Sequence, residues 1–199
     1  GSYKGKAFLV KAGHKLDMPD VMAIMPWFDF GWGSGDKHAL VGSNENFQGI
    51  NSATRFGTIY GRFTTADGAA LGSDYAGATH DGAGGVATLG LTNRVIYGFG
   101  VKTTPAKWSK LTAGVGYYDF SYQKATLQAG DVANARGDKR IGSEVNLTFD
   151  YAHSDNVNFA LAFATFQPGK FIKTAAETGF TGRGVSPARM AMFDTSVKF

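Results

Sequence analysis

Apolar and polar residues alternate along most of this chain. In 141–151, apolar side chains occupy nearly every odd position, and polar or small side chains occupy the even ones. Successive side chains of a β-strand point to opposite faces, so the pattern predicts strands with one apolar and one polar face. No stretch has a clear helical pattern. Eight strands are predicted, at Gly5–Lys15, Ala23–Gly33, Thr58–Phe63, Val86–Lys102, Trp108–Phe120, Ile141–Tyr151, Val157–Phe166 and Arg189–Phe199.

Two local features modify this pattern at its N-terminal end. Residues 17–20, Asp-Met-Pro-Asp, have the composition of a turn. Pro26 lies inside the second predicted strand. Proline has no amide hydrogen to donate to a neighbouring strand, so we expect a weak point there.

The connections between the later strands alternate in length. Short connections are expected at 103–107 and 153–156, and long polar ones at 64–85, 121–140 and 168–188. Outer-membrane β-barrels have this arrangement, because their periplasmic turns are short and their extracellular loops are long. The polar stretch 34–56 is an exception, because the strand count places this long segment on the periplasmic side.

The polar faces of the predicted strands carry charged and small residues. In an outer-membrane barrel such residues line a polar lumen, and aromatic residues near strand ends form girdles at the membrane interfaces. The predicted pore-lining residues are Lys11, Arg62, Arg94, Glu144, Asn146, Asp150 and Asp194. The aromatic residues that match interfacial girdles are Trp108, Tyr117, Tyr151, Phe193 and Phe199. An antiparallel sandwich with one solvated face is the alternative that tolerates the same residues.

The inward-facing residues also bear on the size of the barrel. An eight-stranded barrel has an interior just wide enough to be filled by side chains. Here most inward residues are Gly, Ala, Ser and Thr, which would fill such an interior poorly. We therefore expect an all-β, antiparallel transmembrane β-barrel of outer-membrane type. About eight of its strands are visible, and residues 1–199 form a single domain or the C-terminal portion of a larger barrel.

Composition narrows the class of protein. The chain contains no cysteine, which excludes disulfides and thiol chemistry. It has no apolar run long enough for a transmembrane helix. A mean hydropathy of -0.15 still fits barrel strands, because only every second residue of such a strand is apolar. The net charge of +4 comes from scattered residues, so nucleic acid is not an expected partner. Residues 1–10 lack the pattern of a signal peptide, which suggests a processed or partial product.

No catalytic or metal-binding pattern stands out. The four histidines, at positions 14, 38, 80 and 153, have no ligand spacing. The Asp-rich loops match no calcium-binding motif, and the sequence around Ser34 is not a nucleophile elbow. We therefore expect neither an enzyme nor a bound cofactor. An outer-membrane hydrolase is kept as a remote alternative.

Two stretches have a recognisable pattern. In residues 26–47, a predicted strand ends in Ser-Gly-Asp and is followed by a polar loop; in residues 141–171, two apolar strands are joined by a short turn and followed by Pro-Gly. Both stretches resemble the alginate-export family of outer-membrane porins, and the second resembles the closing hairpin of that family. The matching positions are Ser34, Gly35, Asp36, Gly142, Glu144, Asp150, Phe166, Pro168 and Gly169. The resemblance implies a channel with more than eight strands and a long periplasmic loop after Ser-Gly-Asp. Inward-facing arginines are few, which argues against alginate itself as the solute.

The expected function is a porin-like channel in a bacterial outer membrane, which passes small polar solutes or polysaccharide through a mixed-charge lumen. The alternative is a non-conducting barrel that anchors or encloses a partner protein. The charged lumen residues either orient solutes or only satisfy one another as salt bridges. Expected partners are membrane lipid, the barrel-insertion machinery through Phe199, and further barrel strands or subunits.

Overall fold

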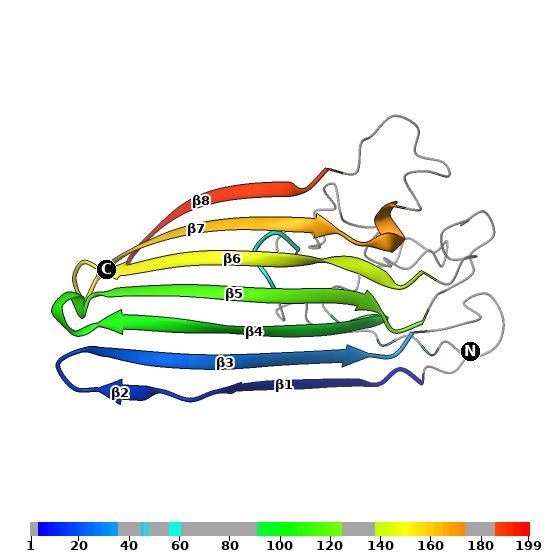
Figure 1. The fold of residues 1–199 in the computed structure, drawn as a ribbon, viewed down its shortest axis with the longest axis horizontal. Helices are drawn as coiled ribbons and strands as arrows, with labels where there is room; N and C mark the ends of the chain where they lie inside the picture. The colour runs from blue at the N-terminus through cyan, green and yellow to red at the C-terminus, as the bar shows by residue number, and fades with distance from the viewer. Residues whose placement is uncertain are drawn as a thin grey trace.

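The structure is a computed structural model and describes residues 4–35, 45, 47, 56–60, 91–124, 138–173 and 186–199. These residues form one antiparallel β-sheet (Figure 1). Its strands are β1 (Ala7–Gly13), β2 (Leu16–Met18), β3 (Met22–Gly33), β4 (Arg94–Pro105), β5 (Leu111–Tyr122), β6 (Arg140–Ala152), β7 (Val157–Pro168) and β8 (Ala188–Val197). A 3-10 helix, η1 (Ala106–Trp108), follows β4. Within the described ranges, no helix has the length and apolar character needed to cross a membrane.

The strands lie in the order β1-β3-β4-β5-β6-β7-β8, and β2 also pairs with β3. Both β1 and β2 keep the same register against β3, because Gly13 pairs with Trp27 and Leu16 pairs with Ile24. They therefore form one edge strand that is interrupted opposite Pro26. The His14 amide donates to the Pro26 carbonyl at 3.1 Å, but Pro26 has no amide hydrogen to return. The missing hydrogen bond coincides with the break between β1 and β2, whereas β3, in which the weak point was predicted, is continuous from Met22 to Gly33.

The two ends of the sheet carry connections of different length. At one end, called here the short-turn end, residues 19–21, 106–110 and 153–156 join successive strands. At the other, the long-loop end on the right of Figure 1, the connections are 34–93, 123–139 and 169–187. Because β3 pairs directly with β4, the whole of 34–93 begins and ends at the long-loop end. The exception predicted for 34–56 was wrong, and no periplasmic loop is needed to explain it.

The periplasmic placement of 34–56 followed from a predicted strand that does not form. Thr58–Phe63 was predicted to be a strand, but Gly57 and Thr58 form a turn, and Ile59 and Tyr60 are helical. Residues 61–63 lie outside the described residues. The described residues still contain eight strands, because Leu16–Met18, predicted to lie partly in a turn, forms β2.

Other strand bounds differ at one end. The strand predicted from Val86 begins at Arg94, because residues 91–93 form a turn in which Asn93 has a φ of 50°; 86–90 lie outside the described residues. It then runs on through Pro105 and into η1. Trp108 is therefore not in a strand, and β5 begins only at Leu111.

The sheet has an apolar outer face, which is largely exposed. The register aligns Phe28, Phe99, Tyr117 and Val145 side by side across β3 to β6. Phe99 is 55% exposed. The exposed large apolar side chains of this face include Phe8, Phe28, Tyr97, Phe99, Val115, Val145, Leu147, Phe163 and Phe193. The opposite face, called the inner face, carries the glycines, alanines and charged residues, as the alternation predicts.

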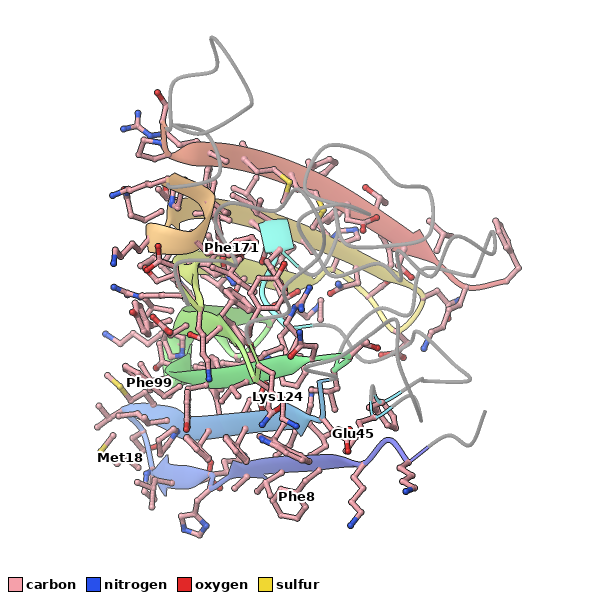
Figure 2. The ribbon with its side chains drawn as sticks, turned by 90° about the vertical axis from the view of Figure 1, so that its right-hand side faces the viewer. Phe8, Met18, Glu45, Phe99, Lys124 and Phe171 are labelled. Atoms are coloured by element: carbon pink, nitrogen blue, oxygen red, sulfur yellow. The ribbon has the colours of Figure 1, made fainter. Side chains whose placement is uncertain are left out.

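The described sheet is open. Its edges are β1 with β2 on one side and β8 on the other, and these edges do not pair with each other. Figure 2, which looks from the long-loop end, shows that the sheet is twisted, so that β1 and β8 run at an angle to each other. An all-β antiparallel fold is thus confirmed, whereas closure into a membrane barrel stays a prediction.

Candidate functional site on the inner face

A short segment of the chain, 56–60, lies against the inner face. Phe56, Ile59 and Tyr60 are almost completely buried there. They belong to a cluster with Leu91, Ile96, Phe120, Tyr122, Ile141, Ala164, Phe166 and Phe171. Figure 2 shows Phe171 close to this segment, which is drawn in cyan. The main apolar core of the described chain is therefore on the polar face of the strands, towards the long-loop end.

Glu144 holds the backbone of this segment. It is in the middle of β6, points to the inner face and is 0% exposed. One carboxylate oxygen accepts hydrogen bonds from the amides of Thr58 and, at 3.0 Å, Ile59; the other accepts from the amide of Tyr60 at 2.8 Å. The first amides of a helical turn have no partner within the turn, so a carboxylate can satisfy them.

Gly57 makes the approach to Glu144 possible. It has a φ of 73°, a conformation that residues with a side chain rarely adopt. A Cβ at this position would lie 2.9 Å from a Glu144 carboxylate oxygen. Both the backbone conformation and the lack of a side chain are therefore needed for the carboxylate to reach the three amides.

Arg94 holds the same segment by its side chain. Only 2% of Arg94 is exposed. Its Nε donates to the Tyr60 hydroxyl at 2.6 Å, and its Nη1 donates to the carbonyls of Thr92 and Asn93. Its guanidinium also lies 4.4 Å from the centroid of the Tyr122 ring, a cation–π contact.

Tyr60 connects these two anchors. Its ring stacks on Phe120 with centroids 3.9 Å apart and also lies near Phe166. Burial of these rings and a charge-assisted hydrogen bond act together at one residue. Within the described part of the chain, Arg94 and Glu144 form no ion pair, with each other or with another residue. Each is satisfied by polar groups instead, so neither charge belongs to the salt-bridge network considered from the sequence.

The other predicted pore-lining residues occupy different surroundings. Lys11 lies 3.8 Å from Asp29 and 5.3 Å from the Phe56 ring. Asn146 is buried on the inner face, and its Oδ1 has no hydrogen-bond partner among the described residues. Arg62 lies outside the described residues.

Asp150 and Asp194 lie nearer the short-turn end. Asp150 pairs with Ala160, which pairs with Asp194, so the two carboxylates flank one alanine on the inner face. No described residue forms an ion pair with either. Among the described residues, 56–60 thus lies over the part of the inner face near the long-loop end, and Asp150 and Asp194 lie nearer the short-turn end without an ion-pair partner.

Three inner-face residues were missed as candidates. Trp27 and Tyr118 have ring centroids 5.4 Å apart, and the Tyr118 hydroxyl lies 3.4 Å from an Asp29 oxygen. The rings rest on glycines of β4 and β5: a Cβ at Gly98 would lie 2.3 Å from the Tyr118 ring. A run of glycines at alternate positions opposite an aromatic strand is the signal that could have identified this packing.

The residues that carry the family resemblance lie mainly at strand ends. The Ser34 hydroxyl accepts from the Lys6 amide at 2.8 Å and donates to the Glu45 carbonyl at 2.7 Å. The Gly169 amide donates to the Ile141 carbonyl at 2.7 Å. These contacts join strand ends to the following segments. Asp36 lies outside the described residues.

In the described ranges, no three His, Asp or Glu side chains gather in a way that could hold a metal ion. At the long-loop end, Lys124 forms an ion pair with Glu45 at 3.2 Å, and the two lie side by side in Figure 2.

Comparison with protein-family models and with curated proteins finds no match for this chain.

Proposed function

We propose that this chain forms part of a passive channel in a bacterial outer membrane. The observation that carries the proposal is the reversal of the two faces. The apolar residues of the outer face are exposed along the strands, whereas charged residues such as Glu144 and Arg94 are buried on the inner face. A water-soluble sheet buries its apolar face, but a membrane barrel exposes that face to lipid and encloses polar residues.

The lengths of the strands support the same conclusion. The strands β3, β4, β5 and β7 each have 12 residues, and β6 has 13. A tilted strand needs about 9–11 residues to cross the hydrocarbon core of a membrane. Every long connection lies at one end of the sheet, as in barrels whose extracellular loops are long.

The segment 56–60 narrows the proposed channel. It lies on the inner face, and Glu144 and Arg94 fix its backbone and the Tyr60 hydroxyl. A wall segment held in this way sets the width of a lumen at that depth, and side chains beside it set the charge that a solute meets.

Conductance in planar bilayers tests this function. The protein is purified in detergent as the complete barrel and inserted into a planar bilayer, where it should give discrete conductance steps. In the same sample, bromine-labelled lipids should quench a tryptophan placed at Phe99 on the outer face but not one placed at Met192 on the inner face. The three native tryptophans are first replaced by phenylalanine. Equal quenching at the two positions would contradict membrane insertion by these strands.

The two measurements separate the two candidate functions. Quenching at position 99 without conductance would support a barrel that anchors or encloses a partner protein. The burial of the cluster around 56–60 is the observation that supports this second candidate, because the segment lies over part of the inner face.

A further inference from the structure

We propose that a pocket at the long-loop end of the sheet binds the phosphorylated headgroup of a lipid in the adjoining membrane leaflet. The pocket has a volume of about 550 Å³, and the residues that line it include Lys4, Lys6, Trp32, Ser34, Glu45 and Lys124. This inference rests on the proposed membrane barrel and adds to it a defined lipid site.

The pocket forms where the ends of three strands are joined. Next to the start of β1, the Lys6 amide donates to the Ser34 hydroxyl at 2.8 Å, and the Ser34 amide donates to the Lys6 carbonyl at 2.8 Å. The Gly35 amide donates to the Gln123 side-chain oxygen at 3.0 Å, which joins the end of β3 to the end of β5. These hydrogen bonds fix the backbone around the pocket and keep its lining side chains together.

The charge of the pocket favours an anion. Lys124 pairs with Glu45 at 3.2 Å, and Figure 2 shows both at this corner of the sheet. Within the part of the chain that the structure describes, Lys4 and Lys6 form no ion pair. A phosphate monoester carries a charge of about −1.5 to −2 at neutral pH and accepts hydrogen bonds from ammonium groups. Its charge therefore matches that of these two lysines.

Trp32 connects the pocket with the outer face of the sheet. A Cβ at Gly31 or Gly33 would contact Leu91 of the inner-face cluster, so Trp32, between them, points to the outer face. It pairs in register with Phe8, which is 57% exposed. Tryptophan rings gather at the level of the lipid headgroups. A pocket that combines such a ring with lysines suits a lipid headgroup better than a phosphate free in water.

The position of the pocket indicates the class of lipid. The long connections of outer-membrane barrels are extracellular, and all long connections of this sheet lie at the same end as the pocket. The outer leaflet of such a membrane is rich in lipopolysaccharide, whose lipid A part carries phosphate groups. The ligand is therefore a lipid A phosphate.

Binding of lipid A to the complete barrel, purified in a neutral detergent, tests the inference. Native mass spectrometry measures the fraction of protein that retains lipid A as the lipid concentration is raised. Lys4→Gln with Lys6→Gln should weaken binding about tenfold, because charged hydrogen bonds are lost. Lys15→Gln with Lys107→Gln removes the same charge near the short-turn end and should leave the affinity unchanged. Lys4→Arg with Lys6→Arg keeps the charge and should retain binding.

Two further ligands separate the lipid from free phosphate. Lipid A from which the phosphates have been removed should bind about tenfold more weakly than lipid A, and equal binding of the two would overturn a phosphate site. Inorganic phosphate at the same concentration as lipid A should not displace the lipid. Complete displacement would assign the pocket to free phosphate and overturn its assignment to a lipid.

The remaining outcomes distinguish this inference from the proposed function. An unchanged affinity in Lys4→Gln with Lys6→Gln, or an equal loss in the control pair, would overturn the lipid site. Quenching at position 99 but not at 192, combined with either result, would contradict only the present inference. Equal quenching at positions 99 and 192 would contradict the proposed function itself.

Discussion

Glu144 is the residue on which the inner face depends most directly. It is fully enclosed and carries no counter-ion from a described side chain. Burial of an unpaired carboxylate is costly, but hydrogen bonds from backbone amides to the charged form offset that cost. The amides of residues 58, 59 and 60 provide them.

Replacing Glu144 by glutamine should loosen the segment 56–60. The neutral amide keeps one acceptor oxygen and turns a donor group towards other donors. Loss of charged hydrogen bonds of this kind costs about 1.5–3 kcal/mol. We expect faster hydrogen exchange at residues 58–60 and larger, noisier conductance. Asp150→Asn is the control, because Asp150 is on the same strand and face without a described ion-pair partner. Equal changes in the two variants would contradict the role of Glu144.

Gly142 offers a test of the packing between the sheet and its cluster. A Cβ there would lie 2.4 Å from the Phe166 ring and 2.6 Å from the Gln167 carbonyl oxygen. Gly142→Ala should therefore destabilise the protein by about 1–3 kcal/mol, the usual cost of overpacking. At Gly13 the nearest atom to such a Cβ is 3.4 Å away, so Gly13→Ala should have little effect. Unfolding midpoints in urea compare the two, and a smaller loss for Gly142→Ala than for Gly13→Ala would refute the packing argument.

At the scale of single residues, the sequence predicted the sheet face of a side chain better than its hydrogen-bond partners. The alternation places Arg94, Glu144 and Asn146 on one face, and the structure places them there. Their partners could not be predicted, because Tyr60 is 84 residues from Glu144 and 34 from Arg94 in the chain. Ile96 shows the same limit: it breaks the alternation of its strand, and only the cluster explains why an apolar residue is buried there.

At the scale of elements, long alternating stretches were reliable and short ones were not. The strands predicted from Ile141 and from Val157 both form, as β6 (Arg140–Ala152) and β7 (Val157–Pro168). By contrast, Thr58–Phe63 offers only a few alternating residues, and a turn with two inward aromatic or apolar side chains gives a similar pattern. The turn forms at 58–60 because the Glu144 carboxylate accepts hydrogen bonds from amides that, in a strand, would have bonded to a neighbouring strand.

The interruption between β1 and β2 gives a prediction for one element. Pro26→Val would supply an amide hydrogen that can donate to the carbonyl of His14, whose own amide already bonds to residue 26. One added backbone hydrogen bond contributes about 1 kcal/mol. We expect β1 and β2 to merge, with slower hydrogen exchange at residues 13–16. Unchanged exchange would show that the break does not come from the missing donor.

At the scale of the whole molecule, the two inner-face carboxylates nearer the short-turn end should set the ion preference of the proposed channel. Asp150 and Asp194 flank Ala160 and lie roughly 10 Å apart, two strand spacings. Two charges 4 Å apart in water interact by about 1 kcal/mol, so Asp150→Asn with Asp194→Asn should lower the cation-to-anion permeability ratio by up to about fivefold.

Reversal potentials in a salt gradient measure this ratio, and the effect should shrink at high salt because the charges are screened. Asp155→Asn, in the turn between β6 and β7, removes the same charge away from the inner face and is the control. An effect of that variant as large as the double substitution would contradict a lumen position for Asp150 and Asp194.

The same scale shows what the sequence could not reveal about assembly. The small inward residues and the family resemblance suggested a larger barrel, but the strand predicted at 58–63 concealed the direct pairing of β3 with β4. Pairing of β3 with β4 across the long connection is a contact between distant segments. The pattern of neighbouring residues does not determine this pairing, so the strand order is visible only in the structure.

The hydrogen bonds between Glu144 and the main chain of 58–60 have a practical consequence for engineering. A carboxylate that binds three amides recognises a backbone shape that Gly57 permits, and none of these hydrogen bonds involves the side chain of Thr58. The side chain at position 58 can therefore be exchanged while the anchor remains. If the chain lines a channel as proposed, a library at this position would alter the passage of solutes one side chain at a time.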